Sequence, residues 1–366
     1  MSTVQLILVG GFLGAGKTTL LARAAGILTL QGRRVGLITN DQAADLVDTD
    51  ILRDAGLEVR EIAGGCFCCR FDQLIDTANA LRASTTPEII IGEPVGSCTD
   101  LSATVLQPIK DLYHADYQLA PFSVLVDPQR LWEVLEPRRA SDMHASARYI
   151  LRKQLEEADI IVVNKRDLLD DAEISELTGA ADHVFPGTPL RFISALTGAG
   201  VAEWLGEVTA SGISGGHIVE VDYDIYAEGE AVLGWLNASA SVTTSADVDW
   251  RAFADGIITG IRQEAQAVHG SVAHVKLSLT AQHKQLHANL TSTDGVVNVI
   301  GDIPADVRQL ALTVNARVEM TPDTLQQIVE RVLQAAAVDG ISVDVATICS
   351  LSPGRPTPTY RYGAVV

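Results

Sequence analysis

Short apolar runs alternate with longer amphipathic stretches over the first 210 residues of the chain. The runs are rich in Val, Ile and Leu, which is typical of strands buried on both faces of a parallel sheet. The predicted strands are residues 4–9, 35–39, 88–92, 123–127, 160–164 and 190–194. The predicted helices are residues 18–30, 72–83, 144–158 and 199–209, and Gly32 is placed to terminate the first of them. This alternation predicts an α/β domain, residues 1–210, with a mainly parallel sheet covered by helices on both faces.

The pattern changes after residues 211–217, a stretch rich in Gly and Ser that we interpret as a linker. Beyond it, the predicted strands are residues 231–239, 271–280, 286–292, 296–302, 311–319 and 341–348. The predicted helices are residues 248–269 and 321–337, the second with Thr321 as N-cap and Pro322 as first helical residue. This order predicts a smaller α+β domain over residues 218–350. The tail, residues 351–366, is rich in Pro and Arg and is expected to lie extended over a surface.

The composition limits the classes of partner. The 366 residues carry a formal net charge of −19. A chain this acidic repels phosphate backbones and anionic membranes, so we expect neither a nucleic acid nor a membrane as partner. No apolar run reaches the length of a membrane span, and the N-terminus lacks the basic segment of a signal peptide. Five cysteines, three of them within four positions, are not a disulfide framework and favour a cytoplasmic protein with a metal or redox role.

The first apolar run leads into the sequence GFLGAGKT, which is the P-loop pattern G-x-x-x-x-G-K-T between a strand and a helix. Gly11, Gly14 and Gly16 allow the backbone N–H groups to turn toward one point. The N-terminus of the following helix adds partial positive charge there, so a polyphosphate has a binding site. Lys17 is predicted to contact the β- and γ-phosphates, and Thr18 to bind Mg²⁺.

A second nucleotide-binding pattern, N-K-x-D, follows the predicted strand 160–164. In GTPases this pattern reads guanine. We expect the Asp167 carboxylate to accept hydrogen bonds from the ring N1–H and the exocyclic amine, two donors that adenine does not present. Asn164 would support the loop, and the stem of Lys165 would pack along the base. Ser194 and Ala195 begin a segment that resembles the S-A-x loop, which also contacts guanine. The nucleotide is therefore predicted to be GTP, and an ATP-dependent small-molecule kinase stays open as an alternative.

The predicted strand 88–92 leads into the sequence EPVG, which begins at Glu93. The Glu93 carboxylate could hold Mg²⁺ through a water molecule or orient the water that attacks the γ-phosphate. The N–H of Gly96 could donate to the γ-phosphate. A surface glutamate at the end of a strand is the alternative reading.

Cys66, Cys68 and Cys69 form the motif C-x-C-C after a pair of glycines. Three thiols in four residues can surround one thiophilic cation. Zn²⁺ takes thiolates at about 2.3 Å in a tetrahedron, and Co²⁺ is a further candidate. Buried structural cysteines and a redox pair are the alternatives. A fourth ligand would come from nearby or from a partner, and we interpret Cys98 as a buried thiol rather than that ligand. We interpret the remaining candidate ligands as solvated histidines: His274, His283 and His287.

The P-loop, C-x-C-C, E-x-x-G and N-K-x-D motifs, in this order, resemble those of the CobW family of metal-handling GTPases. The motifs lie between residues 11 and 198, and the second domain resembles the family in its pattern only. The resemblance implies a metallochaperone in which GTP and Mg²⁺ order the switch loops and create a metal site at the cysteines. Hydrolysis would then release the metal to a client metalloprotein. The resemblance also implies that the following residues bind the phosphates: Gly14, Ala15, Gly16, Lys17, Thr18 and Thr19.

The first switch departs from the family pattern N-E-F-G, because residues 40–43 read N-D-Q-A. Asp41 can still serve Mg²⁺ or the transferred metal. The predicted catalytic residues are Lys17, Glu93 and Asp41. Residues 40–48 and the cysteine loop, residues 64–70, are the two segments expected to respond to the γ-phosphate. A GTPase chaperone for a corrinoid-dependent enzyme, with structural cysteines, stays open as an alternative function, and a homodimer is compatible with the sequence.

Overall fold

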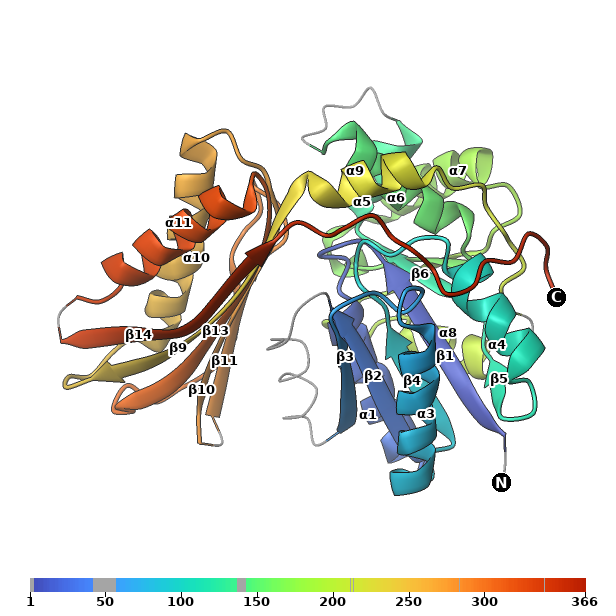
Figure 1. The fold of residues 1–366 in the computed structure, drawn as a ribbon, viewed down its shortest axis with the longest axis horizontal. Helices are drawn as coiled ribbons and strands as arrows, with labels where there is room; N and C mark the ends of the chain where they lie inside the picture. The colour runs from blue at the N-terminus through green and yellow to red at the C-terminus, as the bar shows by residue number, and fades with distance from the viewer. Residues whose placement is uncertain are drawn as a thin grey trace. The chain divides into compact units, whose positions relative to one another are not determined.

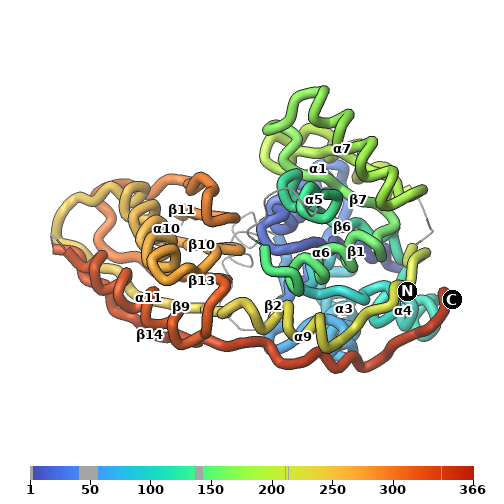
Figure 2. Tube along the Cα trace, turned by 90° about the horizontal axis from the view of Figure 1, so that it is seen from above, coloured from blue at the N-terminus to red at the C-terminus, as the bar shows by residue number. Residues whose placement is uncertain are grey.

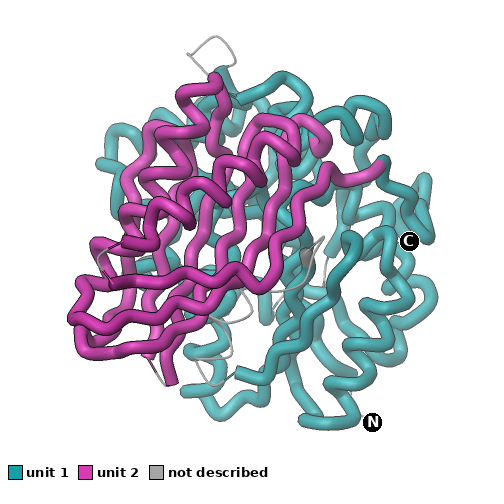
Figure 3. Tube along the Cα trace, turned by 60° about the vertical axis from the view of Figure 1, so that its left-hand side comes forward, with its two compact units in different colours: residues 1–42, 48–229, 355–366 teal, residues 43–47, 230–354 magenta. Residues whose placement is uncertain are grey.

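The computed structural model of the chain describes residues 3–41, 57–136, 143–210, 212, 214–282, 284–338 and 340–366. The side chain of Asp41 also lies outside the described part. The described residues up to Gly229 and from Arg355 onward form one compact unit, and Glu230–Gly354 form another (Figure 3).

The strands and helices of the first unit alternate along the chain, as predicted (Figure 1). Its strands are β1 (Val4–Gly11), β2 (Val35–Asp41), β3 (Glu58–Ala63), β4 (Ile89–Glu93), β5 (Tyr117–Leu119), β6 (Ser123–Val126), β7 (Ile160–Val163) and β8 (Leu190–Phe192). Its helices are α1 (Lys17–Leu30), α3 (Phe71–Thr85), α4 (Gln107–Leu112), α5 (Pro128–Leu135), α6 (Ala145–Glu156), α7 (Asp171–Val184), α8 (Val201–Ala210) and α9 (Tyr223–Ala231). Two further short elements are the π-helix η1 (Ser102–Leu106) and the 3-10 helix η2 (Arg166–Leu168).

The strands of the first unit form a parallel sheet in the order β3-β2-β4-β1-β6-β7-β8, with β5 beside the start of β1. Each apolar run predicted as a strand is part of this sheet, so the predicted α/β fold class is confirmed. The sequence reading missed β3 and β5. β3 lies at the end of the strand order and carries Glu58, Arg60 and Glu61, so it lacks a continuous apolar run. β5 has only three residues.

Helices cover both faces of this sheet, with α1 and α8 on one face and α3, α4 and α6 on the other (Figure 1). Leu20 and Leu28 of α1 share a buried core with Trp204 of α8. The predicted end of the first helix is confirmed, because α1 ends at Leu30 and Gly32 has a left-handed φ of 78°. Among the described residues, no helix combines the length and the apolar character needed to span a membrane.

The second unit is an antiparallel sheet with two helices packed on it (Figure 1). Its strands, in the order β12-β11-β10-β13-β9-β14, are β9 (Leu233–Thr244), β10 (Val272–Ala281), β11 (Lys284–Leu290), β12 (Asn298–Gly301), β13 (Gln309–Glu319) and β14 (Ile341–Leu351). The helices are α10 (Trp250–Ala267) and α11 (Pro322–Ala335). The predicted N-cap is confirmed, because the Thr321 side chain accepts a hydrogen bond from the N–H of Thr324 and Pro322 is the first helical residue. The predicted α+β character of this part of the chain is confirmed too.

The two units divide at Gly229, later than the sequence-based boundary at residues 211–217. The reason is that the predicted linker is bonded to the first unit. The N–H groups of Gly215 and Gly216 donate to the Asp159 carboxylate at 2.6 and 2.8 Å. The N–H of Asp222 donates to the Tyr149 hydroxyl at 2.7 Å. Residues 214–229 therefore complete the first unit.

The C-terminal tail, Arg355–Val366, also belongs to the first unit. It runs in extended form past α9 toward α4 (Figure 2). The N–H of Tyr362 donates to the carbonyl of Ala103 at 3.0 Å, and the N–H of Val366 donates to Gln107 Oε1 at 2.9 Å. The Tyr362 hydroxyl donates to the Asp111 carboxylate at 2.6 Å. The tail is thus anchored along its length.

Candidate nucleotide and metal site

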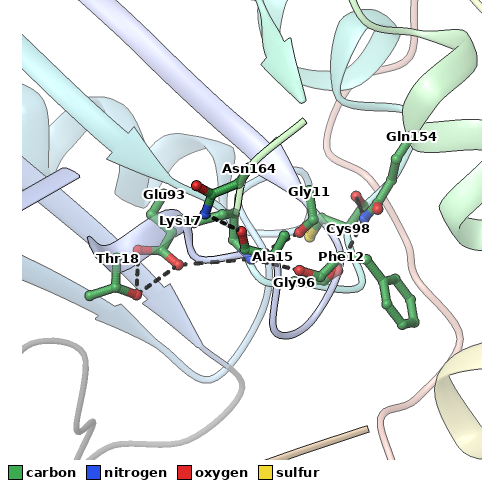
Figure 4. Close-up of polar contacts among 10 residues, drawn as sticks. All are labelled: Gly11, Phe12, Ala15, Lys17, Thr18, Glu93, Gly96, Cys98, Gln154 and Asn164. Carbon is green, nitrogen blue, oxygen red and sulfur yellow. Dashed lines mark hydrogen bonds and ion pairs between the residues drawn. The ribbon is translucent and has the colours of Figure 1, made fainter. Parts of the chain in front are cut away.

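The predicted site residues gather at one edge of the parallel sheet. The P-loop follows β1, the cysteine motif follows β3, Glu93 ends β4, and the N-K-x-D motif follows β7. The carboxyl ends of parallel strands meet at the same edge, which is where ligands bind in open α/β sheets. Figure 4 shows the residues of this edge around Lys17.

The P-loop has the backbone conformation that its glycines allow. Gly11, Gly14 and Gly16 have φ values of 131°, 78° and 92°, which L side chains rarely adopt. A side chain at Gly16 would clash with the amide of Asn164, and one at Gly11 would clash with the backbone of Leu125. The loop therefore presents backbone rather than side chains at the start of α1, as a phosphate-binding loop requires.

Lys17, Thr18 and Glu93 form a buried polar cluster at the start of α1 (Figure 4). Lys17 Nζ donates to the carbonyl of Gly11 at 2.9 Å and lies 3.9 Å from Glu93 Oε1. The Thr18 hydroxyl donates to Glu93 Oε2 at 3.1 Å. A hydroxyl and a carboxylate side by side are the oxygen ligands that Mg²⁺ prefers, so these residues fit the cation implied by the P-loop.

Asn164 connects the P-loop to the loop after β8. Its Nδ2 donates to the carbonyl of Ala15 at 2.8 Å, and its Oδ1 accepts from the N–H of Ala195 at 2.9 Å (Figure 4). The neighbouring Lys165 has a left-handed φ of 60°, and its Nζ lies 2.5 Å from Asp127 Oδ2. Asp167 lies on η2 and is exposed. The structure therefore brings Asn164, the first residue of the N-K-x-D motif, into contact with the P-loop.

The three cysteines of the C-x-C-C motif form one sulfur cluster. The Sγ atoms of Cys66, Cys68 and Cys69 lie within 4.8 Å of one another. The Sγ distance is 2.8 Å between Cys66 and Cys68 and 3.8 Å between Cys68 and Cys69. Cys66 and Cys68 are buried, and Cys69 is half-buried. Asn40 at the end of β2 holds this loop, because its Nδ2 donates to the carbonyl of Gly65 at 2.7 Å.

The sulfur cluster favours one thiolate over the others. Side-chain hydrogen bonds from neighbouring thiols, Cys68 first among them, lower the pKa of Cys66 well below its ordinary value. The hydrogen bond with Cys66 raises the pKa of Cys68, and contact with Cys66 raises the pKa of Cys69 to about 11. The Cys66 thiolate, stabilised by neighbouring S–H groups, can bind a cation first. The bound cation can then displace the protons of the other two thiols.

The loop from Glu93 to Cys98 begins beside the P-loop side chains. Glu93 accepts a hydrogen bond from the Thr18 hydroxyl at one end, and Cys98 at the other end is buried. Gln154 of α6 fixes the loop, because its Nε2 donates to the carbonyls of Gly96 at 3.1 Å and Cys98 at 2.8 Å (Figure 4). The sequence reading of Cys98 as a buried thiol is confirmed.

The C-terminal tail lies against the same sulfur cluster. The N–H of Thr357 donates to Cys69 Sγ at 3.3 Å, and the N–H of Thr359 donates to the carbonyl of Cys68 at 2.9 Å. The Tyr360 ring makes an edge contact with Phe71, with ring centroids 5.2 Å apart. Sequence reasoning missed these contacts, and the only available signal was the prolines on both sides of Thr357, which keep the segment extended.

Several predicted residues lie elsewhere or outside the described part. Thr19 is exposed on α1, and Gly14 is half-buried. Asp41 ends β2, while residues 42–48 of the predicted switch lie outside the described residues. His274 and His287 lie on β10 and β11 in the second unit, and their neighbour His283 lies outside the described residues.

Comparison with known proteins identifies the family. The model described as the CobW/HypB/UreG nucleotide-binding domain matches residues 5–190. The zinc chaperone YeiR of Escherichia coli (strain K12) is 29% identical over 161 residues, which are 44% of this chain and 46% of that protein. The zinc chaperone CobW of Sinorhizobium sp is 28% identical over 187 residues, 46% of this chain and 52% of that protein. This chain therefore spans about half the length of the curated relatives it matches.

Among solved structures, HypB from Helicobacter pylori in complex with nickel aligns with a TM-score of 0.42 at 17% identity, covering 57% of this chain and 86% of that one. The family model spans just over half of the chain and contains the P-loop, the cysteine motif, Glu93 and the N-K-x-D motif. The resemblance inferred from the order of the motifs is confirmed: the chain belongs to the CobW/HypB/UreG family of nucleotide-binding proteins.

Proposed function

We propose that this protein is a GTPase metallochaperone. It binds a thiophilic divalent cation, Zn²⁺ or Co²⁺, at Cys66, Cys68 and Cys69 when GTP and Mg²⁺ are bound, and it delivers the cation to a client metalloprotein. The observation that carries this proposal is the sulfur cluster, with three Sγ atoms within 4.8 Å of one another, at the same edge of the sheet as the Thr18–Glu93 pair of the P-loop. Its free cysteines suit a reducing compartment such as the cytoplasm.

The nucleotide half of the site is proposed to bind GTP. The P-loop from Gly11 to Thr19 cradles the phosphates, and Lys17 exchanges its bonds to the loop carbonyls for bonds to the β- and γ-phosphates. Asp167 accepts hydrogen bonds from guanine, and Lys165 packs along the base. Asn164 holds the loop against the P-loop through its bonds to Ala15 and Ala195.

Thr18 and Glu93 would hold Mg²⁺, which neutralises the charge of the β- and γ-phosphates when bound. Glu93 is positioned to orient the attacking water, and Asp41 at the end of β2 is the further catalytic candidate. Attack of water on the γ-phosphorus breaks the bond to the oxygen that bridges the β- and γ-phosphates. GDP and inorganic phosphate are released, and the phosphate takes the proton of the water.

Loss of the γ-phosphate removes the proposed acceptor of the Gly96 N–H. It also removes the phosphate beside which Glu93 is proposed to act. The cysteine loop is connected to the end of β2 through Asn40. We therefore expect the sulfur cluster to bind its cation more tightly in the GTP state than in the GDP state. The γ-phosphate would shift the population toward the conformation that binds the cation, because it contacts that conformation alone. Zinc is the first cation to test because the curated relatives are named zinc chaperones.

The test is a titration of the protein with Co²⁺, followed by its thiolate absorption bands, in Mg²⁺ with a non-hydrolysable GTP analogue or with GDP. We expect tighter binding with the GTP analogue and loss of the bands in the double variant Cys66→Ala, Cys68→Ala. Cys349→Ala is the matched control, because Cys349 is exposed on β14. Equal affinity with both nucleotides, or in the double variant, contradicts the proposal.

The guanine assignment has its own test. Asp167→Asn replaces a carboxylate acceptor by an amide that can donate. It should weaken GTP binding and favour xanthosine triphosphate, whose base carries a carbonyl where guanine carries its exocyclic amine. Competition with ATP provides the control. ATP that displaces the GTP analogue at equal concentration would contradict the assignment and favour the kinase alternative.

A further inference from the structure

We propose that residues 355–361 of the C-terminal tail form a strap over the sulfur cluster, and that this strap lifts to let a cation enter or leave. The ion pair between Arg361 and Asp100 is the latch that holds the strap closed. This gate rests on the proposed function, because the cation is the one held at the C-x-C-C motif. The strap sets how fast the cation exchanges, whereas the cysteines set how tightly it binds.

The strap lies on the outer side of the sulfur cluster. Cys66 and Cys68 are buried and Cys69 is half-buried, so the side of Cys69 is the accessible side of the cluster. The N–H of Thr357 donates to Cys69 Sγ at 3.3 Å. The N–H of Thr359 donates to the carbonyl of Cys68 at 2.9 Å. The strap is therefore bonded to the cysteine loop on the side from which a cation can approach the sulfurs.

The bonds between the strap and the cysteine loop are easily broken. Prolines at positions 356 and 358 have no N–H, so only every second residue of this stretch can donate to the cysteine loop. The bond from Thr357 ends on sulfur, which is a weak acceptor. The Tyr360 ring adds an edge contact with Phe71, with ring centroids 5.2 Å apart. Contacts of this kind place the strap and allow it to lift while the first unit stays folded.

The firm anchor of the strap is Arg361. Its Nε donates to Asp100 Oδ2 at 2.7 Å, and its Nη2 donates to the carbonyl of Val219 at 3.1 Å. Asp100 is fully buried, and the same Oδ2 accepts from the Tyr223 hydroxyl at 2.7 Å. A buried carboxylate that loses its cationic partner is left unpaired at a high free-energy cost. The ion pair therefore keeps the strap closed for most of the time.

The end of the tail has anchors of its own beyond the latch. The N–H of Tyr362 donates to the carbonyl of Ala103, and the N–H of Val366 donates to Gln107 Oε1. A lifted strap therefore stays tethered and returns to the same place.

The latch acts on rates because it is separate from the sulfur ligands. Arg361 and Asp100 hold the strap in the same way over an empty and over a loaded cluster. A weaker latch raises the open fraction in both states, so the association and dissociation of the cation accelerate by the same factor. The equilibrium affinity, which is the ratio of the two rates, then stays the same.

The test compares the unaltered protein with Arg361→Gln, which removes the charge of the latch and keeps a hydrogen-bond donor. Stopped-flow mixing with Co²⁺, in Mg²⁺ with a GTP analogue, gives the association rate from the growth of the thiolate bands. Displacement of bound Co²⁺ by excess Zn²⁺ gives the dissociation rate. In Arg361→Gln we expect both rates to rise by about tenfold, the effect of losing one hydrogen bond to a charged group, with Co²⁺ affinity unchanged.

Arg331→Gln is the matched control. Arg331 pairs with Glu264 at 2.8 Å in the second unit, and both side chains are exposed. This variant loses an arginine–carboxylate pair that has no part in the strap, so it should exchange Co²⁺ at the rates of the unaltered protein. The same acceleration in both variants would overturn the latch.

The outcomes separate the two proposals. Absence of thiolate bands in the unaltered protein overturns the metallochaperone and the strap together. Nucleotide-dependent bands with unchanged exchange rates in Arg361→Gln overturn the strap alone. A loss of affinity through the dissociation rate alone also overturns the strap, because the tail would then be a fixed part of the binding site.

Hydrogen exchange of the zinc-loaded unaltered protein needs no variant. The N–H groups of Thr357 and Thr359 are bonded to the cysteine loop while the strap is closed, so their exchange reports its opening. At alkaline pH, where each opening leads to exchange, these amides should open at least as fast as zinc leaves for a chelator under the same conditions. Zinc that leaves faster than the strap opens overturns the gate.

Discussion

Glu157 provides a test of how the segment after Cys98 is held. It follows α6, is fully buried, and accepts hydrogen bonds from the Thr99 hydroxyl at 3.2 Å and from the N–H of Ser102 at 2.8 Å. Burial raises the pKa of the Glu157 carboxyl to about 8, and the nearby charge of Asp100 acts in the same direction. At neutral pH the carboxyl is therefore protonated in the folded protein, whereas in the unfolded chain it ionises near its ordinary pKa of 4.5.

The sign of the effect follows from the raised pKa. The stability contribution of Glu157 is fully present below its unfolded pKa and is lost as pH rises toward the folded pKa of about 8. Each pH unit in this window costs about 1.4 kcal/mol of unfolding free energy, so the change from pH 5 to pH 7 is about 2.5 kcal/mol. Glu157→Gln removes the titration and keeps the shape. Its amide oxygen can accept from the Ser102 N–H, and its amide nitrogen can donate to the Thr99 hydroxyl.

We expect the two proteins to have similar stability at pH 5 and Glu157→Gln to be more stable by about 2.5 kcal/mol at pH 7. The measurement is the free energy of urea unfolding between pH 5 and 8. Hydrogen exchange of the α6 amides is the probe, because it reports on the first unit. Glu156→Gln is the control, because the half-buried Glu156 pairs with Arg152 and Lys153, each at 2.8 Å. These pairs lower the pKa of Glu156, so its replacement should give a small loss at neutral pH. A gap between Glu157→Gln and the unaltered protein that stays constant with pH would refute the reasoning.

Three further predictions concern the site. Lys17→Ala should abolish GTP binding and hydrolysis, measured with a fluorescent GTP analogue, because the Lys17 ammonium is the proposed phosphate contact; retained hydrolysis would contradict its role. Asn164→Ala removes two buried hydrogen bonds, one to the Ala15 carbonyl and one from the Ala195 N–H. It should weaken GTP binding, measured by calorimetry, by about tenfold or more. Thr357→Pro removes the N–H donor to Cys69 Sγ in a segment already flanked by prolines. It should weaken Co²⁺ binding by about tenfold and leave GTP affinity unchanged. An equal loss of Co²⁺ and GTP affinity would point to general unfolding instead.

The parallel sheet could be predicted because its strands are continuous apolar runs. β1, β4 and β7 are nearly free of polar residues, and both faces of the sheet are covered by helices. β3 could not be recognised in this way, since Glu58, Arg60 and Glu61 interrupt its apolar residues. The boundary of the first unit was placed too early for a similar reason. Glycine and serine indicate a linker, but the bonds of Gly215 and Gly216 to Asp159 depend on tertiary structure.

The site shows the same distinction between local and distant information. The P-loop and C-x-C-C motifs are contiguous, so their chemistry is visible in the sequence. The contact of Thr357 with Cys69 joins segments 288 positions apart. Gln154 is a polar residue on the buried face of α6, and only the fold shows that its amide holds Gly96 and Cys98.

The anchors around the sulfur cluster limit how it can respond to nucleotide. Cys98 is fixed through Gln154, while the cysteine loop is fixed through Asn40 on one side and Thr357 of the tail on the other. Because both segments are held along their own backbones, the internal shape of each should change little. The distance between them can change, since each segment is held by anchors of its own. We therefore expect the γ-phosphate to act by a small relative shift of two rigid segments. A shift of about 1 Å already moves a sulfur outside bonding distance of a cation that requires about 2.3 Å.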